Sequence, residues 1–114
     1  MPKFDAGAII LVNFPFTDLL SSKVRPALAL ASYGEDVIIL GIFSKVPEFL
    51  QPTWIKIDQH EADFHKTGLK KTSIIKTEKI TVIHKSLIKK EIGRLSPVWL
   101  TAVRKTILQT LKLD

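Results

Sequence analysis

Arg25 is the residue whose type and position most favour phosphate chemistry. The polar residues 17–22 precede it and are expected to form a loop, while the apolar residues 26–31 follow it and are expected to form a strand. A side chain at this junction is both exposed and held in place. Its guanidinium group stays charged and can bind two phosphate oxygens at once. From these residues alone, a surface ion pair with Asp18 or another acid is the simpler interpretation.

Ser44 is the second candidate for contact with phosphate. It follows the apolar residues 37–43, at the expected end of a strand. Its hydroxyl group there can donate a hydrogen bond to a phosphate oxygen beside Arg25. The alternative is a bond to nearby backbone, which is common for serine. Lys45, the next residue, is expected to add affinity for phosphate without being essential.

Three histidines, His60, His65 and His84, carry imidazoles that titrate near neutral pH and suit general-base catalysis. No set of carboxylates or cysteines completes a metal site with them, so we expect each to be structural or exposed. The sequence has no cysteine, glycine-rich phosphate loop or nucleophile elbow. We therefore expect neither a metal nor another cofactor.

The charge of the chain is distributed unevenly. Residues 1–65 contain five basic and eight acidic residues, a charge of about −3, whereas residues 66–114 contain twelve basic and three acidic ones, about +9. A one-sided basic field attracts polyanions, most often RNA or DNA, but a lysine-rich solvated surface without a partner fits the count equally well. Lys76 and Lys79, in the basic part, are expected either to line a nucleic-acid groove or to lie on a solvated strand face.

Short strands must position these residues. Apolar runs rich in β-branched residues, separated by turn residues, predict them. The run at 73–83 is interpreted as one strand or two, and a single helical turn is expected within residues 58–66. The predicted strands cover residues 8–14, 26–31, 37–43, 54–57, 73–83 and 86–95.

A terminal amphipathic helix is the clearest element of the pattern. Ser96 is suited to the N-cap and Pro97 to the first helical position. Many short strands and one helix predict a mainly β (α+β) fold, a small curled sheet or barrel that the helix caps. The apolar stripe of the helix consists of Trp99, Leu100, Val103, Ile107, Leu108 and Leu111.

The composition is that of one ordinary packed domain, which we expect to span residues 1–114, because 46% of the residues are hydrophobic. The N-terminal apolar run, residues 8–12, is too short for a signal-peptide core or a membrane span. We therefore expect a cytoplasmic protein that makes no contact with a membrane.

Several segments, in their order along the chain, resemble the MazF/PemK family of toxins. The most specific of them are the Arg-Pro pair that enters an apolar strand and the late stretch Ile-Gly-Arg-Leu-Ser-Pro. The resemblance departs at Ala8, where the family often has Asp, and at Lys76, near a position where it often has Arg or Asp. The similar segments are residues 7–18, 23–30, 41–44, 68–73 and 92–97.

The resemblance implies an SH3-like barrel, as in MazF/PemK/CcdB-type toxins, and a homodimer with its active site near the interface. It implies a metal-independent endoribonuclease that cleaves single-stranded RNA or mRNA through attack of the ribose 2′-hydroxyl, and that a cognate antitoxin neutralises. On this basis Arg25 stabilises charge on the phosphate and Ser44 assists it.

Around the same site, Phe16 is a candidate for stacking on an RNA base and Lys23 for contact with backbone phosphate. Phe14 is expected in the core or a dimer interface, which is also the alternative for Phe16. Two other functions are compatible with the same fold. One is a non-catalytic dimeric module that binds RNA or DNA, and the other is a toxin that poisons a protein such as DNA gyrase, for which Trp99 would have to be exposed.

Overall fold

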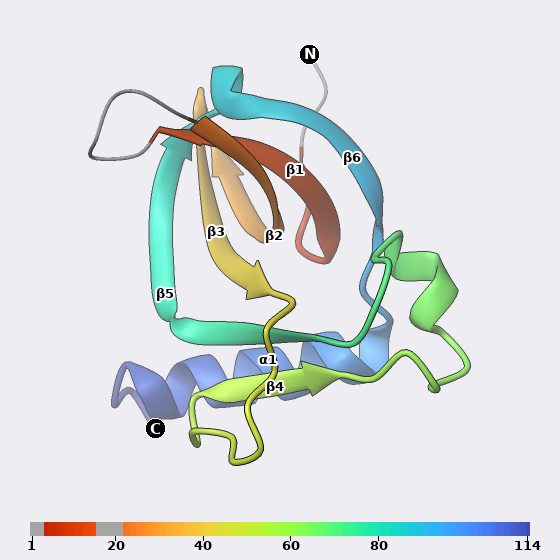
Figure 1. Ribbon diagram of the computed structural model, residues 1–114. Coiled ribbons are helices and arrows are strands. Elements are labelled where there is room, and N and C mark those ends of the chain that lie inside the picture. The colour runs from red at the N-terminus through yellow and green to blue at the C-terminus, as the bar shows by residue number, and fades with distance from the viewer. Residues whose placement is uncertain (1–3, 16–21) are drawn as a thin grey trace.

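The computed structural model describes residues 4–15 and 22–114 of the chain (Figure 1). Within them, six strands form one antiparallel sheet in the order β4-β5-β3-β2-β1-β6. The predicted mainly β fold with a C-terminal helix is confirmed. The elements are β1 (Ala8–Pro15), β2 (Ser22–Tyr33), β3 (Asp36–Phe43), β4 (Trp54–Ile57), the 3₁₀ turn η1 (Phe64–Thr67), β5 (Ser73–His84), the 3₁₀ turn η2 (Lys85–Leu87), β6 (Ile88–Arg94) and α1 (Pro97–Thr110).

Apolar side chains lie on both faces of the neighbouring strands β1, β2 and β3. Two buried clusters result: one contains Leu28 and Leu40, and the other contains Ala27 and Ile39. Neighbouring residues of β2 and of β3 thus alternate between the clusters, as the pleat of a strand requires. This two-sided burial explains why residues 26–31, whose propensities also allow a helix, form part of a long strand.

β5 turns a corner partway along its length. Its pairing with β3 shifts between Leu40, opposite Ile80, and Gly41, opposite Lys76. Figure 1 shows the first half of β5 running along α1 and β4, and the second half rising beside β3. The run predicted as one strand or two is therefore one strand with an irregular, bulge-like register shift that leaves residues 77–79 without partners in β3. Bulges redirect side chains and are frequent beside functional sites.

The helix begins as expected. The Ser96 side chain accepts a hydrogen bond from the backbone N–H of Trp99 at 3.4 Å, and Pro97 is the first helical residue. Trp99 packs against the cluster that contains Leu28, but Leu108 and Leu111 are 48% and 43% exposed. The predicted apolar stripe therefore continues past the cluster that the helix covers. No helix of the described residues is long and apolar enough to cross a membrane.

Candidate active site

A cavity of about 500 Å³ lies on the face of the sheet that carries Arg25. Arg25 is half-buried in β2, opposite Val12 of β1. Pairing with β1 fixes its backbone, so the guanidinium group is presented from a rigid strand. The β5 corner brings Glu78 and Lys79 to the same cavity. The sequence-predicted residues Arg25 and Lys79 are thus placed together.

Glu78 is bound to the segment around β4. Its two carboxylate oxygens accept hydrogen bonds from Thr53 Oγ1 at 2.8 Å and from Trp54 Nε1 at 2.9 Å. Burial disfavours the charged form of Glu78, but the bonds from Trp54 and Thr53 outweigh it and hold the pKa of this carboxyl below its ordinary value of 4.5. Glu78 is therefore a weak base, and it fixes the position of the Trp54 ring.

Lys76 occupies a position between two aromatic rings. Its Nζ lies 4.6 Å from the centroid of the Phe43 ring and 4.5 Å from that of Trp54. The β4–β5 register, with Trp54 opposite Lys76, produces this arrangement. Ammonium groups are attracted to the faces of such rings. Lys76 is half-buried in this stack, and its contact with RNA stays a prediction.

Ser44 lies in a second cavity, of about 590 Å³. This cavity also contains Val24 of β2, and it shares Pro26 with the Arg25 cavity. Because successive side chains of a strand point to opposite faces, Val24 and Arg25 diverge. The structure thus places Ser44 and Arg25 in adjacent cavities, and their cooperation at one phosphate stays a prediction.

Two of the remaining predicted contact residues are lysines that line neither cavity. Lys23 and Lys45 are both exposed. Lys23 lies two residues before Arg25, and Lys45 directly follows Ser44. Phe14 is half-buried and lines the Arg25 cavity while it packs against the cluster that contains Ile39. Phe16, the candidate for base stacking, and Asp18, the alternative partner of Arg25, lie outside the described residues.

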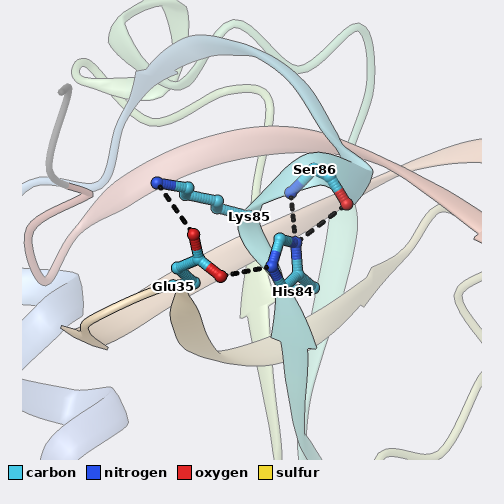
Figure 2. Close-up of polar contacts among 4 residues, drawn as sticks. All are labelled: Glu35, His84, Lys85 and Ser86. Carbon is cyan, nitrogen blue, oxygen red and sulfur yellow. Dashed lines mark hydrogen bonds and ion pairs between the residues drawn. The ribbon is translucent and has the colours of Figure 1, made fainter.

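His84 belongs to an exposed polar cluster at the turn between β2 and β3 (Figure 2). The backbone N–H of Ser86 donates to His84 Nδ1 at 3.1 Å, and His84 Nε2 lies 3.0 Å from a carboxylate oxygen of Glu35. Nδ1 is therefore the acceptor, and the ring donates from Nε2. The hydrogen bond from His84, the charge that its ring carries when protonated, and the charge of Lys85 hold the pKa of Glu35 below its ordinary value.

This cluster is separate from both cavities, which His84 does not line. The other two histidines make local contacts. His65 Nδ1 lies 3.1 Å from the carbonyl oxygen of Ala62, and the backbone N–H of His60 donates to Asp58. Across the part of the chain that the structure describes, no three metal-ligating side chains gather.

A sequence profile of the family described as PemK-like, MazF-like toxin of type II toxin–antitoxin system matches residues 5–111. The chain belongs to this toxin family. Solved toxin structures have the same fold. The Mycobacterium tuberculosis toxin MazF-mt6 superimposes with a TM-score of 0.72 at 20% identity, over 94% of this chain and 98% of that chain.

Two structures of complexes are also similar to this toxin. MazE–MazF from Deinococcus radiodurans gives a TM-score of 0.76 at 15% identity, with 96% of each chain covered. A mycobacterial endoribonuclease in complex with its cognate antitoxin gives 0.72 at 14% identity, over 100% of this chain and 98% of that chain. At these identities the likeness shows the fold alone. No curated protein matches the sequence.

Proposed function

We propose that this toxin is a metal-independent endoribonuclease that cleaves single-stranded RNA through attack of the ribose 2′-hydroxyl on its own phosphate. The observation that supports this most is the placement of Arg25. It is half-buried on a central strand and faces a cavity large enough for part of a nucleotide, with Lys79 beside it. Membership of the toxin family supports it independently.

Cleavage requires a proton to leave the 2′-hydroxyl, charge to be stabilised on the phosphorane and a proton to reach the leaving 5′-oxygen. Arg25 meets the second requirement, because its planar fork matches two phosphate oxygens. Lys79 adds positive charge from the same cavity. Ser44 donates its hydroxyl hydrogen to a phosphate oxygen from the adjacent cavity. The general base is unassigned, since both oxygens of Glu78 are engaged.

A cognate antitoxin and a second copy of the chain are the protein partners in this proposal. Two similar structures are complexes of a toxin with its antitoxin. Large apolar side chains of this chain are exposed: Phe49 is 81%, Val98 79% and Leu113 69% accessible. These side chains are candidates for coverage by either partner.

A non-catalytic module that binds nucleic acid is the alternative. Two observations favour it: the Lys76 ammonium group is held between the Phe43 and Trp54 rings, and Glu78 is tied to Thr53 and Trp54. Neither of these charged groups is then available for proton transfer without rearrangement. Such a module binds RNA in a salt-sensitive manner and leaves it intact.

Incubation with a long single-stranded RNA in excess chelator separates the two functions. The ribonuclease produces discrete fragments that end in a 2′,3′-cyclic phosphate, and Arg25→Ala abolishes them. Arg104→Ala, which removes an exposed arginine of α1 outside the Arg25 cavity, serves as the matched control and retains cleavage. Intact RNA with a folded wild-type protein that still binds RNA would establish the binding module instead.

A further inference from the structure

The cavity that contains Ser44 is lined by three lysines, Lys70, Lys71 and Lys90. No acidic residue lines it within the described part of the chain. All three lysines are exposed, and none takes part in an ion pair among the described residues, whereas Lys66 and Lys85 do. The cavity thus carries a local positive charge that the described residues leave uncompensated.

Two glycines hold the loop of Lys70 and Lys71 against the strand of Lys90. Gly68 has a left-handed backbone, with φ 74°, and a methyl group there would collide with the carbonyl group of Ile92. A methyl group at Gly93 would collide with the backbone of Thr67. Side chains larger than hydrogen are excluded at both places, so the loop after η1 packs directly on β6.

Hydrogen bonds fix the rest of this loop. The buried Thr67 Oγ1 donates to the carbonyl of Phe64 at 2.7 Å and accepts from the N–H of Leu69 at 3.1 Å. Gln59 and Thr72 exchange two bonds, each of 3.0 Å, between the backbone of one and the side chain of the other. The lysine side chains therefore extend from a fixed backbone.

The lining chemistry favours a nucleotide as the occupant. Ammonium groups are strong point charges for phosphate, and three of them line this cavity. Leu11, Val24 and Ile92 provide an apolar surface on which a base or ribose can rest. Pro26 lines both this cavity and the Arg25 cavity, so the two are neighbours along β2.

We propose that this lysine cavity is a phosphate-binding subsite for the RNA strand next to the scissile phosphate held at Arg25. The inference rests on the proposed ribonuclease function and adds three lysines that hold the substrate without taking part in the reaction. An acidic peptide also matches the lysine charges, but the shared wall at Pro26 favours an RNA strand that extends from the neighbouring Arg25 cavity.

The test compares two triple variants that lose the same net charge. Lys70, Lys71 and Lys90 are changed to Gln in one, and the exposed Lys56, Lys89 and Lys105, which lie outside the cavity, in the other. Binding of a 2′-O-methyl RNA, which cannot be cleaved by 2′-hydroxyl attack, is measured over a range of salt concentrations. The cavity variant is expected to bind about tenfold more weakly, with a salt slope smaller by about 0.7 for each phosphate that it no longer neutralises. The control variant stays within about twofold of wild type.

Cleavage of unmodified RNA gives a second measurement, in which the impairment of the cavity variant falls on KM rather than kcat. Equally weakened binding in both variants would overturn the subsite, because net charge alone would then explain it. Unchanged RNA binding by the cavity variant, with binding to a polyglutamate peptide abolished, would show a protein-docking site instead. If wild type cuts RNA and the cavity variant binds normally, only this inference fails; if wild type neither binds nor cuts RNA, the proposed function fails with it.

Discussion

The two cavities differ in how their charge is arranged. In the Arg25 cavity, charges of both signs belong to paired strands, and the only carboxylate among the described lining residues, Glu78, is hydrogen-bonded to Trp54. In the lysine cavity, the charge has one sign and is carried on long side chains of a loop and of β6, which lies at the end of the sheet order. Fixed groups suit stabilisation of a transition state, whereas flexible ammonium groups suit holding of a polyanion. The difference implies a division between reaction and binding.

Replacement of Arg25 is expected to have the largest effect. Arg25→Lys keeps the charge but loses the bidentate fork, so we expect kcat to fall by roughly 10²–10³, as for removal of one preorganised donor, with little change in Tm. Single-turnover cleavage at saturating enzyme measures this step. Full activity of Arg25→Lys would show that positive charge alone matters at this position. The guanidinium group of the Arg25 cavity would then have no advantage over the ammonium groups of the lysine cavity.

Gly93→Ala tests the support of the lysine cavity and leaves its three lysines unchanged. The new methyl group would collide with the Thr67 backbone, and overpacking of this kind costs about 2–3 kcal/mol in the free energy of unfolding. Urea denaturation measures it. Gly34→Ala is the control, since it has a positive φ of 58° but open space around the new methyl, and is expected to cost about 1 kcal/mol. Similar costs for both would mean that the close approach at Gly93 is not required.

Glu78→Gln tests whether the wall of the Arg25 cavity depends on a charged clamp. The pKa of Glu78 is lowered in the folded protein, so its carboxylate stabilises the fold above the ordinary value of 4.5 and this contribution is lost as pH falls further. At neutral pH we expect a loss of about 1 kcal/mol for the weakened bonds to Trp54 and Thr53.

The measurement is urea denaturation of wild type and of Glu78→Gln at several pH values, with Trp fluorescence as the signal of unfolding. The difference between the two proteins should shrink as pH falls below 4.5. Glu48→Gln, at an exposed glutamate outside the cavity, should track wild type. A difference that grows on acidification would contradict the assigned role, because it would require a raised pKa.

The sequence predicts the secondary-structure elements better than it predicts the side-chain contacts between them. Periodicity and turn residues identify the strands and the helix. The expected junction before residue 26 singles out Arg25, but β2 begins at Ser22, so Arg25 lies within the strand and its catalytic role stays a prediction. The Trp54–Glu78 bond and the Lys76 stack depend on the register between β4 and β5, which pairs segments about twenty residues apart. The placement of Ser44 in a separate cavity follows from strand alternation, but only once the register between β2 and β3 is known.

His84→Ala is expected to have the smallest effect. The imidazole has a suitable chemistry for proton transfer, but its Nδ1 is occupied by the Ser86 N–H and its Nε2 by Glu35, and it lines neither cavity. Because His84 lines neither cavity, we expect wild-type cleavage and a pH–rate profile that superimposes on that of wild type. We also expect an intact fold, because an exposed pair of this kind contributes little to folding. Loss of cleavage with the fold intact would place the general base at the β2–β3 turn, and the division between a reacting Arg25 cavity and a holding lysine cavity would no longer be sufficient.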